Sequence, residues 1–304
     1  MDKIFSINNI KKAFMKFNVK PKDLSGKVVL LTGGNEGIGY HTAIQLAKMN
    51  AEVIIASRNK EKSIKAVENI KNISGNDKIG YRLLDLGSIQ GVKDFAEDFK
   101  KDYSKLDLLI NNSGANFLNY GVSQDGLEKT LHINHIGPFI LTLSLLDIIE
   151  KAETLEFFEN LTLPQDLNPD PKNYSYMKEY SRSKLMNILF TKELAKRLAN
   201  KNIIVAAVHP GFVKSNLGLD SITNPIINLF ARIAMFFITS IFARSGEEGA
   251  KTTIFAAIDD SIKSGEYYDA CAVGVVQPQG HDEDLALQLW NESAKIAGLD
   301  PNIV

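Results

Sequence analysis

A cluster of glycines near the N-terminus constrains the fold of this chain more than any other feature. An apolar, β-branched run at 27–32 (KVVLLT) leads into the cluster TGGNEGIG at 32–39, and a helical pattern follows from Tyr40 to Met49. Glycine permits a tight turn and a close approach of the backbone to a pyrophosphate. A helix N-terminus adds free N–H groups and the positive end of a dipole. Strand, glycines and helix in this order therefore predict a loop that binds the phosphates of a dinucleotide.

Apolar runs alternate with helical patterns along the rest of the chain. We expect strands at 27–32, 52–57, 80–86, 106–112 and 202–209, and helices at 40–49, 59–72, 90–103, 126–134, 137–152 and 180–200. Strands that alternate with helices of this length indicate βαβ units around a parallel sheet. The sequence therefore predicts a single α/β domain with a Rossmann-type, doubly wound parallel sheet in three α/β/α layers.

Two apolar segments lie apart from this alternation. The domain is expected over 25–304, and in the extension at 1–24 the residues Ile4, Ile7, Ile10 and Phe14 recur at near-helical spacing among lysines. This spacing predicts an amphipathic helix that docks on the domain or, in the alternative, contacts a membrane surface. Residues 225–244 approach the length of a membrane span, but Arg232 interrupts them. We expect an apolar helix over a substrate pocket there.

The composition narrows the partners and the compartment. A net charge of -1, with lysines spread among acidic residues, gives no footprint for nucleic acid. Cys271 is the single cysteine, which favours a reducing compartment over secretion. The five histidines form no metal-binding pattern with Cys, Asp or Glu. We expect a cytoplasmic protein without a metal, with membrane association as the alternative.

The end of the second expected strand indicates which dinucleotide binds. Sites that prefer NAD usually carry an acidic residue here, which holds the ribose 2′-hydroxyl. This chain has Ser57 and Arg58 instead. A guanidinium can form charge-assisted hydrogen bonds to a 2′-phosphate. The sequence therefore favours NADP(H) over NAD(H).

Four motifs together resemble those of the short-chain dehydrogenase/reductase family. They are TGGNEGIG (32–39), INNSG (110–114), YSRSK (180–184) and HPGFVKS (209–215). The flanking segments INHIGPFILT, SRSKLMNILFTKELAKRL and GEYYDACAV are similar to the retinol dehydrogenase-like and WW-domain-oxidoreductase-like branch. The resemblance covers about residues 25–298. It implies hydride transfer between a nicotinamide and a carbonyl or alcohol carbon, and relatives often pair as homodimers.

The resemblance also implies residue roles. Tyr180 would be the general acid/base, and Lys184, at i+4 on the same helix face, would favour its ionised form and hold the nicotinamide ribose. Asn134 would support a water relay to Lys184. The cofactor would contact Gly33, Asn35, Glu36, Gly37, Ile38, Gly39, Ser57, Arg58, Asp85, Leu86, Asn112, Gly114, Tyr180, Lys184, Pro210, Gly211, Val213 and Ser215.

One part of the family pattern is missing. Relatives place a fifth strand ending in a catalytic serine between Asn134 and the YxxxK helix, with a sequence such as RIVNVSS. Here the expected helix runs through 143–153 directly into TLEFFENLTLPQDLNP at 154–169. Loss of that strand would leave its neighbours about 10 Å apart and remove a hydrogen-bond donor from the reaction centre. Residues 155–162 could form a replacement strand with Thr162 near the serine position, but Glu156 and Glu159 would then be buried at a cost.

Three functional hypotheses follow from the motifs and the missing strand. The first is an NADP(H)-dependent oxidoreductase whose substrate is a small lipophilic carbonyl or alcohol compound, because residues 225–244 are apolar. The second is a catalytically impaired NADP(H)-binding protein. The third is a truncated gene product that folds poorly. Retention of Tyr180, Lys184 and Asn134 favours descent from an active enzyme.

Overall fold

The computed structural model describes residues 19–149, 167–211, 213 and 244–304. Four sequence predictions lie outside the described residues: the N-terminal helix at 4–14, the replacement strand at 155–162, Ser215, and the apolar helix over a substrate pocket except for its last residue, Arg244. The described part of the extension, 19–24, contains no helix, and Val19 and Leu24 pack against the domain core.

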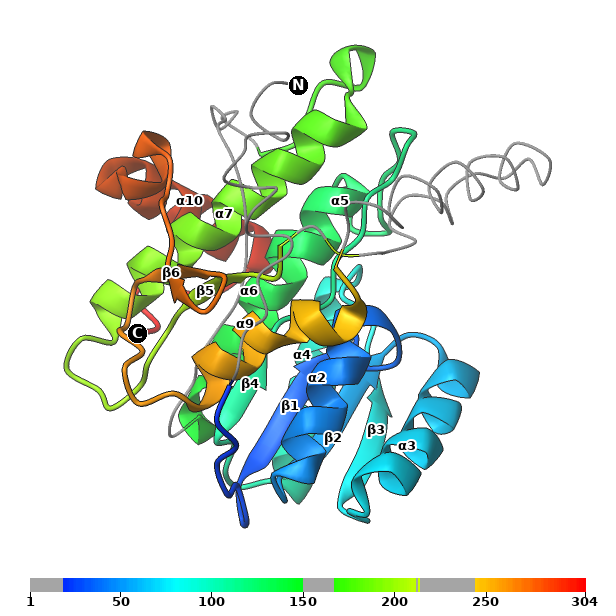
Figure 1. Cartoon of the computed structure of the whole chain (residues 1–304). Helices are drawn as coiled ribbons and strands as arrows, with labels where there is room; N and C mark the ends of the chain where they lie inside the picture. The colour runs from blue at the N-terminus through cyan, green and yellow to red at the C-terminus, as the bar shows by residue number, and fades with distance from the viewer. Residues whose placement is uncertain (1–18, 150–166, 212, 214–243) are drawn as a thin grey trace.

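The larger sheet contains four parallel strands (Figure 1). In the order β3-β2-β1-β4 they are β3 (Ile79–Leu83), β2 (Glu52–Ser57), β1 (Val28–Thr32) and β4 (Leu108–Ile110). Thr32 pairs with Ala56 and Leu31 with Ile110, so the carboxyl ends of the strands meet at one edge. The two βα loops after β1 and β2 therefore begin side by side.

Helices cover both faces of this sheet. Val29 and Leu31 of β1 point to a core shared with α2 (Gly37–Lys48), α3 (Lys60–Ser74) and α9 (Gly246–Ile258). Leu30 points to the opposite core, formed with α4 (Ile89–Asp102), α6 (Gly137–Ser144), α7 (Tyr176–Arg197) and α10 (Glu283–Ala297). The expected doubly wound, three-layer arrangement is confirmed, because alternate residues of a strand face opposite sides.

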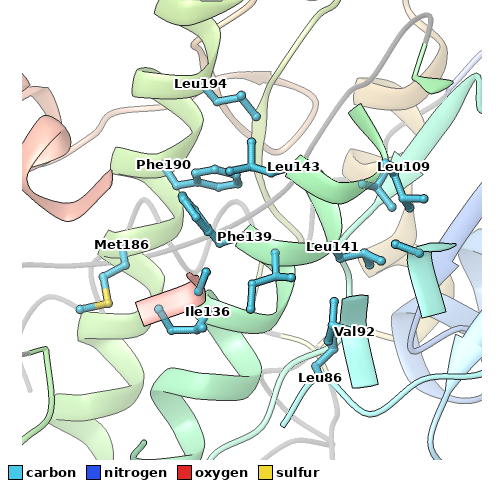
Figure 2. Close-up of a cluster of buried hydrophobic side chains, with 14 of the residues drawn as sticks. Leu86, Val92, Leu109, Ile136, Phe139, Leu141, Leu143, Met186, Phe190 and Leu194 are labelled. Carbon is cyan, nitrogen blue, oxygen red and sulfur yellow. The ribbon is translucent and has the colours of Figure 1, made fainter. Parts of the chain in front are cut away.

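The core beneath α6 and α7 is rich in aromatic side chains. Phe139 and Phe190 pack with ring centroids 5.2 Å apart, and Trp290 of α10 lies 5.2 Å from Phe139. All three rings are buried. Figure 2 shows Phe139 and Phe190 among Ile136, Leu143 and Leu194. This core fixes α7 against α6 and α10, and so fixes the helix that carries the YxxxK motif.

A second, smaller sheet contains β5 (Ala207–His209), β6 (Tyr267–Asp269) and β7 (Ala272–Val273). β5 and β6 are parallel, whereas β6 and β7 form an antiparallel hairpin. The two turn residues of this hairpin, Ala270 and Cys271, have φ angles of 57° and 56°. Residues with a Cβ adopt this left-handed conformation at a cost.

The two sheets form no common ladder in the described part of the chain. Beyond β4, a single parallel bridge joins Leu106 to Ile149, and the N–H of Leu106 donates to the carbonyl of Ile148 at 2.6 Å. This discontinuity lies where the sequence lacks the fifth strand of the family.

The prediction of a helix at 137–152 was wrong at residues 145–149, and residues 150–152 lie outside the described part of the chain. α6 ends at Ser144, a 3₁₀ turn η2 (Leu146–Ile148) follows, and Ile149 is extended. Leu145 and Ile149 are buried, so this segment turns inward to fill the core and pair with Leu106. An extended residue that bridges to Leu106 thus stands at position 149, where the sequence predicted helix.

Other boundaries also differ from the sequence expectation. The strand expected at 202–209 is limited to β5, and the helix expected at 180–200 begins earlier, at Tyr176. The segment at 126–134 forms one turn, α5 (Lys129–Leu131), followed by a π-helical turn η1 (His132–Ile136). Two further 3₁₀ turns are η3 (Pro171–Asn173) and η5 (Pro278–His281). Arg244, expected in a helix, instead forms a parallel bridge with Val213.

Within the described ranges, no helix combines the length and the hydropathy that crossing a bilayer would require. The same residues contain no group of three His, Cys, Asp or Glu side chains that could hold a metal ion.

Candidate cofactor and catalytic site

The glycine loop between β1 and α2 has the backbone that its sequence requires. Gly33 and Gly37 have φ angles of 69° and 60°, a region that favours glycine. The N–H of Gly33 donates to the carbonyl of Ala56 at 2.8 Å, so the loop rests on the end of β2. A Cβ on Gly37 would meet no atom within 4 Å. The backbone of Gly37 is therefore open on the side where a side chain would project, which suits a close approach of a phosphate at a helix N-terminus.

Two other glycines in the loop are required by close packing. A Cβ on Gly34 would lie 2.4 Å from Cγ2 of Ile55, and a Cβ on Gly39 would lie 2.4 Å from both the carbonyl oxygen of Gly33 and Nδ2 of Asn112. Asn112 donates from Nδ2 to the carbonyl of Thr32 at 2.9 Å. Asn112 thus supports the glycine loop through its side chain. It has this structural role in addition to the cofactor contact that the sequence analysis expected.

Ser57, the last residue of β2, and Arg58, which follows it, are the two residues that the sequence analysis selected for recognition of the adenosine ribose and its 2′-phosphate. Ser57 is buried, and its Oγ lies 2.7 Å from Oγ of Ser63. Arg58 is exposed. The structure adds a residue that the sequence analysis missed: Nζ of Lys62 donates to Oε2 of Glu36, in the glycine loop, at 2.9 Å. Its signal was a lysine in the first turn of the helix after Arg58.

The two residues expected to contact the adenine, Asp85 and Leu86, have different surroundings. Asp85 lies after β3, and its Oδ1 accepts the N–H of Gly87 at 3.0 Å. The Leu86 side chain is buried in the core shown in Figure 2. The backbone of Leu86 packs against α6 at Gly137, where a Cβ would lie 2.4 Å from its carbonyl oxygen. Any contact between Leu86 and a ligand would therefore involve its backbone.

The YxxxK residues lie together on α7. Nζ of Lys184 is 5.4 Å from the centroid of the Tyr180 ring, and Lys184 is only 6% exposed. A Cβ on Gly114 would lie 3.5 Å from this Nζ and 3.7 Å from Oδ1 of Asn134. Three segments that are distant in the sequence thus meet: the loop after β4, the π-helical turn and α7. The geometry brings together the three residues expected to be catalytic.

Asn134 fixes the loop after β4 relative to Tyr180. Its Oδ1 accepts the N–H of Ala115 at 2.7 Å, and its Nδ2 donates to the Ala115 carbonyl at 2.8 Å and to Oγ of Ser183 at 3.0 Å. Ser183 in turn donates to the carbonyl of Tyr180 at 2.7 Å. Single π-helical turns occur frequently at functional sites, where they redirect a side chain. The expected water relay through Asn134 stays a prediction.

A buried ion pair flanks Tyr180, and the sequence analysis did not identify it. Arg182 and Glu179 are 3% and 5% exposed, and Nη1 of Arg182 lies 2.9 Å from Oε2 of Glu179. Arg182 also donates from Nη2 to the carbonyl of Leu167, a buried residue with a φ of 60°. Arg182 therefore ties α7 to Leu167, a single residue in the left-handed conformation.

The PG motif after β5 contacts a second buried arginine. Gly211 has a φ of 80°, and Nη1 of Arg244 donates to the carbonyl of Pro210 at 3.5 Å. Arg244 is 5% exposed, and burial lowers its pKa from the usual value, against the opposing effect of Asp269. Val213, the other described residue of the motif, pairs with Arg244. The motif is thus held in place by a cation that the sequence analysis had assigned to an apolar helix.

The comparisons with known proteins agree with this geometry. Residues 27–154 match the family model of the short chain dehydrogenases. Retinol dehydrogenase 11 of Mus musculus is 35% identical over 286 residues, which cover 91% of this chain and 88% of the relative. Retinol dehydrogenase 13 of Homo sapiens is 32% identical over 287 residues, which cover 91% and 86%.

Solved structures show the same fold. A protein from Mycobacterium paratuberculosis superposes with a TM-score of 0.76 at 27% identity, over 94% of this chain and 99% of that one. A short chain dehydrogenase from Escherichia coli CFT073, solved with NADPH, gives a TM-score of 0.61 at 19% identity, over 83% and 99%.

The fold and the site together define a dinucleotide-binding oxidoreductase with a Rossmann-type sheet. Within that class, the chain belongs to the short-chain dehydrogenase/reductase family, in the retinol dehydrogenase-like branch.

Proposed function

We propose that this protein is an NADP(H)-dependent oxidoreductase that interconverts an alcohol and a carbonyl group of a lipophilic substrate. The observation that carries the proposal is the buried Lys184 beside the ring of Tyr180, with Gly114 and Asn134 next to it. The loop after β4 is tied to the glycine loop, because the N–H of Ser113 donates to Oγ1 of Thr32 at 2.9 Å. This hydrogen bond supports a single site formed by Tyr180, Lys184 and the glycine loop.

The residues present fit the cofactor. The open space at Gly37 and the positive φ of Gly33 suit a pyrophosphate, and Arg58 suits a 2′-phosphate. NADP(H) would supply or accept the hydride when bound. We propose contacts from the glycine loop, from the ends of β2, β3 and β4, and from the PG motif, at the residues named above from Gly33 to Val213; Ser215 would complete this set.

The protein's own residues would move the proton. The hydroxyl of Tyr180 would donate a proton to the substrate oxygen during reduction and accept it during oxidation. The ammonium of Lys184 would stabilise the ionised phenol. The names of the relatives support a retinoid-like alcohol or aldehyde as substrate. The apolar residues at 225–244 also support a lipophilic substrate.

A catalytically impaired NADP(H)-binding protein is the second candidate, and one specific observation favours it. Beside β4 the described residues form one isolated bridge, Leu106 to Ile149, where relatives have a strand that ends in a catalytic serine. A missing donor at the reaction centre could lower turnover by about a hundredfold or more without affecting cofactor binding.

The experiment that tests the proposal combines a cofactor titration with turnover. NADPH binding to the purified 304-residue chain is followed by fluorescence, and NADPH oxidation is measured with retinaldehyde and long-chain aldehydes. Tyr180→Phe should lower kcat/KM by about a hundredfold or more, with NADPH affinity retained. Tyr176→Phe is the matched control, because Tyr176 lies one turn earlier on α7 and is 40% exposed.

Each outcome of this experiment decides between the candidates. Turnover that depends on Tyr180 establishes the oxidoreductase. Tight NADPH binding without turnover favours the binding protein, and equal affinity for NADPH and NADH contradicts the proposed cofactor preference.

We also propose a cellular location, an oligomeric state and a domain boundary for this protein. The lone cysteine supports a cytoplasmic location. The alternative is contact with a membrane surface through the N-terminal extension. A homodimer is proposed on the resemblance alone. The domain boundary near residue 25 is supported by the start of β1 at Val28.

A further inference from the structure

An ion pair connects the glycine loop to the helix after β2. Oε2 of Glu36 accepts a hydrogen bond from Nζ of Lys62 at 2.9 Å, although the residues are 26 positions apart. Their side chains are 62% and 52% exposed. An ion pair this exposed contributes little to folding, because solvent screens it and two long side chains lose freedom. Its position calls for a different explanation.

The pair lies above the carboxyl end of β2. The loop that carries Glu36 rests there, since Gly33 donates to Ala56 and Gly34 packs on Ile55. Lys62 is fixed at the same edge, because its backbone N–H is capped by Oδ1 of Asn59 at 2.9 Å. This is the position at which dinucleotide-binding folds recognise the ribose of the adenosine.

The charges at this edge bear on cofactor choice. Arg58 and Lys62 provide two cations, and Glu36 provides one carboxylate. An unpaired carboxylate at this edge would repel a 2′-phosphate, whereas it could accept a hydrogen bond from a 2′-hydroxyl. Lys62 neutralises this carboxylate. Because the ion pair is weak, its ammonium can exchange the carboxylate for a phosphate at little cost.

We propose that Lys62 determines the cofactor selectivity of this protein: it pairs with Glu36 in the free protein, and on binding it exchanges this carboxylate for the 2′-phosphate of NADP(H), which it holds together with Arg58. Glu36 becomes an acceptor for the 2′-hydroxyl of NAD(H) when the lysine is removed. This inference rests on the proposed function, and it assigns to Lys62 and Glu36 the discrimination that the sequence analysis gave to Arg58 alone.

The test measures dissociation constants for NADPH and NADH by fluorescence titration, without turnover. In Lys62→Met the dissociation constant of NADPH should rise about tenfold or more, because a charge-assisted hydrogen bond is lost and Glu36 is left unpaired. NADH affinity should stay the same or increase, so the preference for NADPH falls by at least that factor. Glu36→Gln should retain NADPH affinity, and adding it to Lys62→Met should restore part of the loss.

Two controls keep the test interpretable. Lys71→Met removes the same charge from the last turn of α3, about 13 Å further along the helix, and should leave the preference unchanged. Lys62→Arg keeps the charge and should preserve most of the preference. Circular dichroism and thermal unfolding of each variant check that it is folded.

The outcomes separate this inference from the proposed function. A wild-type protein that prefers NADPH, with Lys62→Met and Lys71→Met behaving alike, overturns the role of Lys62 and leaves the proposed function intact. A wild-type protein that binds neither dinucleotide overturns both.

Discussion

The two sheets of this protein differ in how they hold the site. In the larger sheet β1 pairs with β2 along five residues, and the glycine loop lies against β2 through Gly33 and Gly34. In the smaller sheet the strands have two or three residues, and one hairpin turn is strained at Ala270 and Cys271. The glycine loop therefore takes its shape from a continuous ladder, whereas the positions of Tyr180 and Lys184 depend on the packing and side-chain bonds of α7.

This difference explains why a discontinuity in the sheet is compatible with an assembled site. Tyr180 and Lys184 are positioned by the aromatic core under α7 and by the bonds from Asn134 to Ser183 and Ala115. The bridge at Ile149 contributes a single contact next to β4. Side-chain packing and hydrogen bonds from side chains to the backbone thus replace part of the support that a central strand would give to α7.

The largest effect is expected where the catalytic helix relies on a buried ion pair. Arg182→Met leaves the carboxylate of Glu179 buried without its partner and removes the bond to Leu167. Breaking a buried pair in this way typically costs about 3–5 kcal/mol. We expect a loss of that size in the free energy of unfolding, measured by urea denaturation.

Two comparisons sharpen this expectation. Glu179→Gln combined with Arg182→Met should recover part of the loss, because no charge is then buried. Lys196 lies on α7 like Arg182, but its ion pair with Glu283 of α10 is exposed. Lys196→Met breaks this pair and should change the free energy of unfolding little. An Arg182→Met protein as stable as the wild type would show that α7 is held by its apolar core alone.

A smaller effect is expected at the glycine loop. In Gly39→Ala the new Cβ would lie 2.4 Å from the carbonyl of Gly33, a backbone atom that cannot easily move. Overpacking of this kind costs about 1–3 kcal/mol, and the shifted loop should lose NADPH affinity. Unfolding and NADPH titration measure the two effects separately.

The matched control is Gly80→Ala in β3. A Cβ there meets nothing within 4 Å, so this variant should bind NADPH normally and be as stable as the wild type or slightly more. Normal NADPH binding by Gly39→Ala would argue against the close packing of the loop.

The smallest effect is expected at the hairpin of the second sheet, and it should be favourable. Cys271 occupies the second turn position with a φ of 56°, where glycine is the preferred residue. Cys271→Gly should therefore raise the free energy of unfolding by about 1 kcal/mol. Ala272→Gly, in the adjacent strand β7, should instead lower it. Equal effects of the two substitutions would contradict the assignment of strain to the turn.

Much of the fold could be predicted because local signals and packing agree in the larger sheet. The apolar run at 52–57 predicts a buried parallel strand from its own residues alone. The glycines at 33–39 likewise predict a tight loop. The helix expected through residue 152 failed for a tertiary reason. Ile149 is buried and pairs with Leu106, and no local pattern announces a partner more than 40 positions away.

The proximity of Tyr180 and Lys184 was predictable, because the motif fixes both the residues and their spacing on one helix. Contacts between charges that meet only after folding were not predictable. Arg182 and Lys62 look in the sequence like ordinary solvated residues of helices. The structure buries Arg182 against Glu179 and brings Lys62 to Glu36.

The π-helical turn at His132–Ile136 has a consequence for the spacing of this region. The N–H of Gly137 bonds to the carbonyl of His132, five residues earlier, so this turn contains one more residue than an α-helical turn. In an α-helix each residue advances the phase by roughly 100°. Deleting a single residue here would rotate the Asn134 side chain away from Ala115, although no other residue would be substituted. Chain length, as well as residue identity, is therefore constrained between Lys129 and Gly137, and an alignment gap within this segment marks a change in phase.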